Sequence, residues 1–344
     1  MRTRKPPFPL SLRLCGAALA AVLLTGCGGQ QSVLAPKSHQ SRDIATLFWW
    51  MTGGAAVGLG LIVLLLLLAW KRRDRRGIGA DSEGDKPGER FSWYVVVGLG
   101  VALPIVLLSS LFVVADVFVI RTTEAPAASA TRMTIEVIGH QWWWEVRYPG
   151  TAAVAANEIH IPVRTPVRVE VRTDDVIHSF WVPELNRKID TIPGRHNDIE
   201  LYADAAGRYR GACSEFCGVQ HAYMAMYVFA DPPAVFQRWL AAQAASAQAP
   251  VGALAEQGER AFTGGSCASC HTVRGTSAQG SVGPDLTHVA SRTTLGALAL
   301  PNDRGSLSQW IADSQRSKPG NQMPATHVPA AELKALVAYV AGLR

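Results

Sequence analysis

Residues 213–224 place two thiols, an imidazole and a thioether in one short stretch, which reads CSEFCGVQHAYM. Soft sulfur ligands select copper, and a weakly bound Met beside His and Cys marks electron-transfer copper sites. His178, expected at the end of a strand-like run, would add a second imidazole. A mononuclear centre of this kind uses one Cys, whereas two thiolates four residues apart can each bridge two metals. The residues therefore predict a binuclear copper centre.

Two other chemistries fit part of the same pattern. Cys213 and Cys217 could form a disulfide, because the chain begins with an export-type leader and disulfides persist outside the cytoplasm. A disulfide, however, requires neither His221 nor Met224. Zinc could be held by two Cys and two His, but structural zinc has no use for the Met. Copper gives every one of these side chains a role, so we favour it.

A second redox motif follows at residues 267–271, which read CASCH. C-x-x-C-H is the attachment motif of c-type haem. The thiols of Cys267 and Cys270 would bond the haem vinyl groups, and His271 would be an axial iron ligand. Met323, followed by a proline, is the expected sixth ligand, because a Met/His pair raises the haem potential. Two histidines, His288 and His327, remain alternative ligands.

The residues around this motif indicate a complete small domain. An amphipathic helix is expected to begin around 258–262, a Gly-Pro turn lies at 283–286, and a last helix is expected over 330–343. A bare C-x-x-C could instead be a redox dithiol. That alternative explains neither the following imidazole nor the downstream Met, so residues 251–344 are predicted to form a cytochrome c domain.

The copper ligands must be carried by a different kind of domain. Residues 133–139 and 167–173 alternate apolar and polar side chains, as half-buried strands do. Further strands are expected at 158–162 and 198–202, and residues 223–229 would be the strand that leaves the copper loop. Short strands separated by Pro and Gly predict an all-β sandwich or Greek-key barrel.

Charge and hydropathy indicate a membrane protein. Residues 1–124 carry 14 Lys/Arg and 8 Asp/Glu, which equals the whole net charge of +6. Residues 44–70 and 92–115 contain no charged side chain, and each is long enough to span a bilayer. The basic run KRRDRR between them, at 71–76, is assigned to the cytoplasm by the positive-inside rule. The excess charge therefore reports topology, and no nucleic-acid partner is expected.

The N-terminus has the features of a bacterial export signal. Basic residues precede an apolar stretch that is too short to span a membrane, and the sequence LTGC at 24–27 resembles a lipoprotein cleavage site. Cleavage before Cys27 and acylation of its thiol are therefore predicted. An uncleaved or ordinarily cleaved leader is the alternative.

The copper-type stretch resembles the copper A loop of cytochrome c oxidase subunit II. That loop reads C-x-E-x-C-x₃-H-x₂-M, and every position fits, with His178 in the expected D-V-x-H-S context. Together with the fused haem domain, the chain resembles the bacterial caa3 type. The resemblance implies the following roles: two thiolates that bridge two copper ions (Cys213, Cys217), one imidazole on each copper (His178, His221), a weak thioether ligand (Met224) and a backbone carbonyl ligand (Glu215).

Further roles come from the resemblance alone. The carboxylate of Glu215 would face a magnesium ion shared with subunit I. The GHQW motif at 139–142 would make Trp142 the exposed ring through which electrons enter the copper centre. Three successive tryptophans on a strand would otherwise be packing residues, and alternation would send Trp143 to the opposite face from Trp142. Asp174 and Asp175 fall in the family's acidic docking region, but here they are expected to be solvated charges.

The predicted fold class is a multidomain membrane protein with a two-helix transmembrane hairpin, an all-β cupredoxin domain of the Greek-key sandwich type, and an all-α cytochrome c domain. Its predicted segments are a lipoprotein-type leader (1–26), an outer linker (27–43), transmembrane helices (44–70 and 92–120), a cytoplasmic loop (71–91), the copper A domain (125–232), a helix and linker (233–250) and the cytochrome c domain (251–344).

This organisation implies the electron-entry subunit of a proton-pumping terminal oxidase in the inner membrane, with both redox domains on the periplasmic face. The expected cofactors are two copper ions, one covalent haem c and an interfacial magnesium. The expected partners are the catalytic subunit I, other oxidase subunits, and a cytochrome c or a quinol-cytochrome c reductase as donor. A copper A subunit of a nitric oxide reductase and a membrane-anchored copper protein without a catalytic partner remain alternatives.

Overall fold

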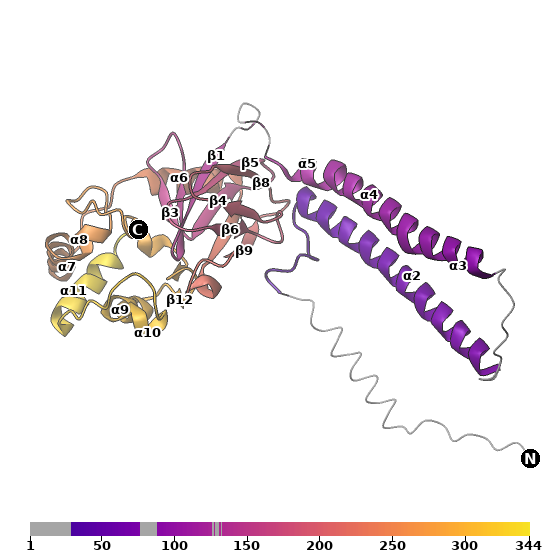
Figure 1. Cartoon of the computed structure of the whole chain (residues 1–344). Helices are drawn as coiled ribbons and strands as arrows, with labels where there is room; N and C mark the ends of the chain where they lie inside the picture. The colour runs from indigo at the N-terminus through magenta and orange to yellow at the C-terminus, as the bar shows by residue number, and fades with distance from the viewer. Residues whose placement is uncertain (1–28, 76–87, 126, 128–130, 132) are drawn as a thin grey trace, which may run out of the picture.

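The fold is taken from a computed structural model that describes residues 29–75, 88–125, 127, 131 and 133–344. It shows three parts in a row: a helical hairpin, a β-sandwich and a C-terminal helical domain (Figure 1). The predicted leader, Cys27 and most of the predicted cytoplasmic loop lie outside the described residues.

The hairpin consists of two long helices that run side by side (Figure 1). The first is α2 (His39–Arg75), which extends beyond the predicted 44–70 at both ends. At its start, the Ser38 hydroxyl caps the helix by accepting a hydrogen bond from the Ser41 N–H at 3.0 Å. The second is one continuous run made of α3 (Gly88–Val97), η1 (Gly98–Ala102), α4 (Leu103–Ala115), η2 (Asp116–Ile120) and α5 (Arg121–Thr123).

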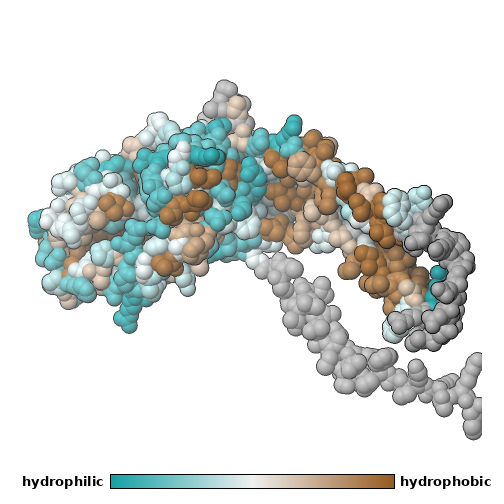
Figure 2. Space-filling view, in the orientation of Figure 1, coloured by the Kyte–Doolittle hydropathy of each residue, from teal (hydrophilic) through white to brown (hydrophobic). Residues whose placement is uncertain are grey.

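The π-helical turn η1 has a local cause. Pro104, in the first turn of α4, has no N–H to donate to the carbonyl four residues earlier, so the regular hydrogen-bond pattern cannot continue through it. The two helices satisfy the length and hydropathy of membrane spans over His39–Arg72 and Trp93–Thr123, and their apolar windows are not buried inside the protein. Figure 2 shows this as a mostly brown surface over the hairpin. The prediction of two apolar membrane helices is confirmed.

The β-sandwich has two five-stranded sheets. The first, in spatial order, contains β3 (Val154–Ala156), β2 (Trp143–Arg147), β1 (Thr134–His140), β5 (Val167–Thr173) and β8 (Asn197–Leu201). The second contains β4 (Glu158–Pro162), β10 (Ala225–Asp231), β9 (Gly207–Cys213), β6 (His178–Trp181) and β7 (Ile189–Thr191). The alternating burial predicted for 167–173 is seen along β5, and Trp144 and Phe180 lie in the core between the sheets.

Three local expectations were wrong. His178 begins β6 and does not end a strand, because it follows the turn at 174–177. Tyr223 belongs to a short 3₁₀ turn, η4 (His221–Tyr223), and the strand that leaves the copper loop starts only at Ala225. Trp142 lies in the turn between β1 and β2, so strand alternation does not decide its direction.

The helical domain follows α6 (Pro233–Ala244) and a short connection. It contains α7 (Ala253–Gly264), α8 (Cys267–Cys270), η5 (Val289–Ser291), β11 (Thr294–Leu295), β12 (Leu300–Pro301), α9 (Arg304–Ala312), α10 (Ser314–Ser317) and α11 (Ala330–Val340). Helices α7 and α11 cross closely at Gly258, where a Cβ atom would lie 2.0 Å from the Ala335 carbonyl oxygen. The last helix is shorter than the predicted 330–343, because Ala341 and Gly342 form a turn after it.

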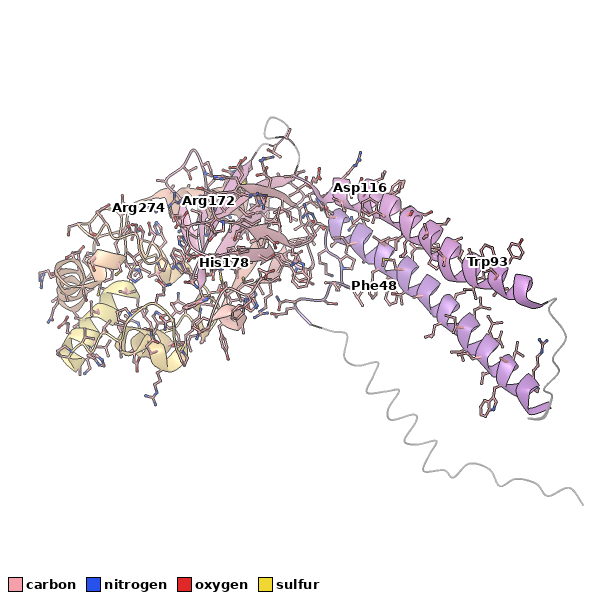
Figure 3. The ribbon with its side chains drawn as sticks, viewed as in Figure 1. Phe48, Trp93, Asp116, Arg172, His178 and Arg274 are labelled. Atoms are coloured by element: carbon pink, nitrogen blue, oxygen red, sulfur yellow. The ribbon has the colours of Figure 1, made fainter. Side chains whose placement is uncertain are left out.

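Two sets of contacts fix the β-sandwich between its neighbours. On the membrane side, the backbone of Lys37 donates to the Glu184 carbonyl at 2.8 Å and accepts from the Asp204 N–H at 2.9 Å. On the other side, the buried Glu158 of β4 accepts hydrogen bonds from the N–H and the hydroxyl of Thr293 at 2.7 and 2.6 Å. Arg274, labelled in Figure 3, donates to the Ala152 carbonyl at 2.5 Å. The helical domain is therefore docked on the sandwich.

Candidate functional site

The predicted copper ligands meet at one end of the sandwich, where β6 begins (His178 in Figure 3) and the loop after β9 returns to β10. The two sulfur atoms of Cys213 and Cys217 lie 3.8 Å apart. The Nδ1 atom of His178 is 4.0 Å from the sulfur of Cys213, and that of His221 is 3.7 Å from the sulfur of Cys217. The Met224 sulfur is 3.8 Å from Cys217. The donor atoms of His178, Cys213 and Cys217 all lie within 4.8 Å of one another, and those of His221 and Met224 approach from the side of Cys217.

This donor set fits copper. Both cysteines are free thiols, and a sulfur separation of 3.8 Å is far longer than the ~2.05 Å of a disulfide bond. The structure therefore does not support the alternative disulfide. The hydrogen bond from Cys217 lowers the pKa of the Cys213 thiol, so the first of the pair ionises readily. Two soft sulfurs with an imidazole beside each are a suitable set for two copper ions bridged by thiolates.

Glu215 presents two different groups. Its carbonyl oxygen lies 3.2 Å from the Cys213 sulfur, inside the ligand cluster. Its carboxylate is half exposed and stands 3.9 Å from the Nζ of Lys188. The backbone is therefore placed to serve the copper site, whereas the side chain faces outward.

Asp175 has a role that the sequence reading missed. Its carboxylate is 2.7 Å from Nε2 of His178, and it also accepts a hydrogen bond from the Gln141 N–H at 2.6 Å. Burial alone would raise the pKa of Asp175, but these hydrogen bonds outweigh it and lower the pKa. The expectation of a plain solvated charge was wrong for this residue, because Asp175 orients the ring of His178 so that Nδ1 faces the thiols.

We expect Asp175→Ala to weaken copper binding by roughly 10- to 100-fold, the usual cost of losing the hydrogen-bond partner of a metal-binding imidazole. Competitive titration of the purified protein with a copper chelator would measure this. Asp174→Ala is the matched control, because the neighbouring Asp174 pairs with Arg172 and has no contact with His178 among the described residues. Equal weakening in the two variants would contradict the assigned role.

Two further side chains hold the copper loop from the β1–β2 turn. The indole Nε1 of Trp142 and the amide Nε2 of Gln141 both donate to the Cys217 carbonyl, at 3.0 and 2.8 Å. A Cβ atom on Gly218 would lie 3.0 Å from the Trp142 ring, so the small residue permits this approach. Trp142 is only partly exposed, which corrects the expectation of an exposed ring.

The haem motif lines a cavity of about 450 Å³. His271 is held by a hydrogen bond from Nδ1 to the Pro284 carbonyl at 2.8 Å, which leaves Nε2 as the free nitrogen. Burial lowers the pKa of His271, so the ring is neutral at pH 7 and able to bind iron. Gly283 lies against this ring, where a Cβ atom would come within 2.5 Å. The cavity is lined by residues from both folded domains, among them Cys267, Cys270, His271, Trp310, Met323, Arg292 and Trp142.

The residues that line this cavity fit a haem group, and Met323 is the candidate that would provide the second iron ligand. Met323 lines the cavity, whereas the other two candidates are placed elsewhere: the Nε2 of His288 donates to the Ala245 carbonyl at 2.9 Å, and His327 is exposed. The Arg292 guanidinium also lines the cavity, and its Nε is buried without a partner among the described residues. A buried guanidinium N–H suits a carboxylate such as a haem propionate.

The fold and these two donor sets define the class of the protein: a membrane-anchored electron carrier with a copper-type loop on a β-sandwich and a c-type haem cavity in a helical domain. Two family models match the chain. One is the cytochrome c oxidase subunit II periplasmic domain, over residues 152–230, and the other is cytochrome c, over residues 255–344.

Comparison with curated proteins covers nearly the whole chain. It is 32% identical to cytochrome c oxidase subunit 2 of Alkalihalophilus pseudofirmus over 96% of this chain and 97% of that protein. It is 27% identical to the subunit 2 of Bacillus subtilis, over 95% and 96% of the two chains. A crystal structure of the periplasmic domain of subunit II from Bradyrhizobium japonicum is 33% identical over 32% of this chain and 92% of that one, with a TM-score of 0.31.

The chain belongs to the cytochrome c oxidase subunit 2 family. It is an electron-entry subunit of a cytochrome c oxidase, and it carries its own cytochrome c domain.

Proposed function

We propose that this chain carries electrons from a haem in the helical domain to a binuclear copper site in the β-sandwich, and from there to the catalytic subunit that reduces oxygen to water. The haem would be held by Cys267, Cys270, His271 and Met323. The copper ions would be held by His178, Cys213, Cys217, His221, Met224 and the carbonyl of Glu215. Bound haem and copper would supply reversible one-electron chemistry.

One observation carries this proposal: Trp142 belongs to both sites. Its indole donates to the carbonyl of Cys217 at 3.0 Å, and the same residue lines the haem cavity. A single residue therefore contacts the copper loop and also lines the cavity that would hold the haem. The protein's own residues bind the cofactors, orient them across Trp142 and bury the copper thiols from water.

Other parts of the chain would bind magnesium, the other oxidase subunits, the electron donor and the membrane. The half-exposed carboxylate of Glu215 is the group that would reach a magnesium ion shared with subunit I. The apolar helices α2 and α4 would pack in the inner membrane beside subunit I and other oxidase subunits, with both redox domains on the periplasmic side. A separate cytochrome c or a quinol-cytochrome c reductase would deliver electrons to the haem, and acylation of Cys27 would add a lipid anchor.

Electron transfer inside the purified complex tests the role of Trp142. We expect Trp142→Phe to slow the reoxidation of photoreduced haem by on the order of tenfold, because the variant loses the hydrogen bond to Cys217 and with it the alignment of the two sites. Copper and haem contents, measured by metal analysis and optical spectra, should stay at wild-type values.

Trp143→Phe is the matched control. Trp143 also lines the cavity and stacks on His140 at 4.5 Å, but it has no hydrogen bond to the copper loop among the described residues. An unchanged rate in the Trp142 variant, or an equal loss in both variants, would show that electrons do not pass at Trp142.

A further inference from the structure

One short segment of the helical domain touches both redox sites. Residues 318–323 leave α10 and end at Met323 in the haem cavity. The segment is held in a fixed shape: the Lys318 N–H donates to the Ser314 carbonyl at 2.9 Å, and the Asn321 side chain donates to the Lys318 carbonyl at 2.7 Å. Gly320 turns the chain with a φ of +84°, a conformation that favours glycine.

The same segment lies against the copper loop. The carbonyl of Pro319 accepts a hydrogen bond from the side chain of Gln220, which is one residue before His221. At Gly320, a Cβ atom would lie 3.1 Å from the Val219 side chain. The haem-side segment and the copper loop are therefore in direct contact, and the orientation of one constrains the other.

Lys318 makes the closest polar contact between this segment and Trp142. Its side chain crosses the interface, and Nζ donates to the Trp142 carbonyl at 3.1 Å and to the Gly296 carbonyl at 3.2 Å. Lys318 is only 4% exposed, and it lines the haem cavity. No carboxylate lies within ion-pair distance of Nζ among residues 29–75, 88–125 and 133–344.

An ammonium group in this place is unusual on physical grounds. Taking a charge out of water costs free energy, and two carbonyl groups offset only part of that cost. Burial lowers the pKa of Lys318 to about 8, so the group still carries its charge at neutral pH. A methionine of similar length would fill the same space without this cost, but it could not bond the two carbonyls or bring a positive charge to the cavity.

We propose that Lys318 is a positioning residue for electron transfer: it fixes the backbone of Trp142 against the haem cavity, and its charge favours the reduced state of the haem. The inference rests on the proposed function, because it requires haem in the cavity and copper on the loop. It goes beyond the proposed function because it assigns the alignment of the haem cavity and the copper loop to Lys318, which is a ligand of neither cofactor.

Three variants of the full chain, assembled in the oxidase complex, test this role. In Lys318→Met, reoxidation of photoreduced haem should slow by about three- to tenfold, a smaller loss than the roughly 100-fold that a misplacement near 1 Å can cost a positioned reaction. The haem potential should shift to a more negative value. Lys318→Arg, which keeps charge and donors, should recover at least half of the lost rate.

Thr293→Val is the control for docking in general. It removes a hydroxyl hydrogen bond to Glu158 across the same two domains, in which Trp142 takes no part, and should change the rate by less than about twofold. Spectra of the wild-type complex are recorded first, to show whether both haem and copper are present. Absence of either cofactor would contradict the proposed function and not the role of Lys318. With both cofactors bound, a wild-type rate and potential in Lys318→Met, or the same loss in Thr293→Val, would overturn the assignment.

Discussion

Replacing Cys217 with Ser should abolish the binuclear copper site and lower oxygen consumption by the purified complex by more than roughly 100-fold. Loss of an outer hydrogen-bond partner already costs a metal site about 10- to 100-fold, and Cys217 is itself a central ligand. Its sulfur lies within 4 Å of the Cys213 sulfur, the His221 nitrogen and the Met224 sulfur. The visible and near-infrared absorption of the copper site and the copper content would be measured together.

Ser214→Ala is the matched control for this change. Ser214 lies in the same loop, but it is the backbone N–H that bonds the Ser179 carbonyl, at 2.9 Å. The loop should therefore keep its shape and its copper. A Cys217→Ser complex that retained two copper ions and normal turnover would refute the thiolate bridge. Loss of copper in both variants would instead point to a general collapse of the loop.

The second large effect is expected for His271→Ala. The haem would stay attached through Cys267 and Cys270 but lose its axial imidazole, so its low-spin spectrum should disappear. Turnover with an external cytochrome as donor should fall by roughly 100-fold, because the axial ligands control a potential range of about 0.8 V. Optical and paramagnetic resonance spectra of the reduced and oxidised complex would report the change.

His288→Ala tests whether any buried histidine of this domain would have the same effect. His288 is buried, but its Nε2 is committed to the Ala245 carbonyl at 2.9 Å. Its removal should leave the haem spectrum unchanged. Met323→Ala completes the series, since the opposite axial position should then become vacant and the haem high-spin. A low-spin spectrum in the Met323→Ala variant would show that a residue other than Met323 is the sixth iron ligand.

The local motifs could be predicted from the sequence because their residues are close together in the chain. The spacing of Cys213, Cys217 and His221 brings three ligands into one loop without help from the rest of the fold. The same holds for residues 267–271 of the haem motif. The fold class was also predictable and is confirmed. Long apolar runs indicate membrane helices, and alternation of apolar and polar residues indicates half-buried strands. The domain boundaries stay predictions.

The contacts between distant residues could not be predicted in the same way. Asp175 looked like a surface acid, and only the fold brings its carboxylate to 2.7 Å from the His178 ring. No sequence pattern pointed to the role of Lys318, because its hydrogen-bond partner Trp142 is 176 residues away in the chain. Trp142 was expected to be exposed, since nothing in the sequence shows that the helical domain packs over it. Such features depend on docking between domains, which hydropathy does not encode.

The joint between the helical hairpin and the β-sandwich has a mechanical consequence. Lys37 is bonded to the sandwich through both its N–H and its carbonyl, and α2 begins only two residues later. With 37 residues, α2 is about 55 Å long, which exceeds the ~30 Å hydrocarbon core of a bilayer. Long helices adapt to a thinner bilayer by tilting. Because these two backbone hydrogen bonds hold the start of α2 against the sandwich, a tilt of the hairpin also tilts the sandwich. Membrane thickness therefore sets the height and the tilt of the copper loop relative to the lipid surface.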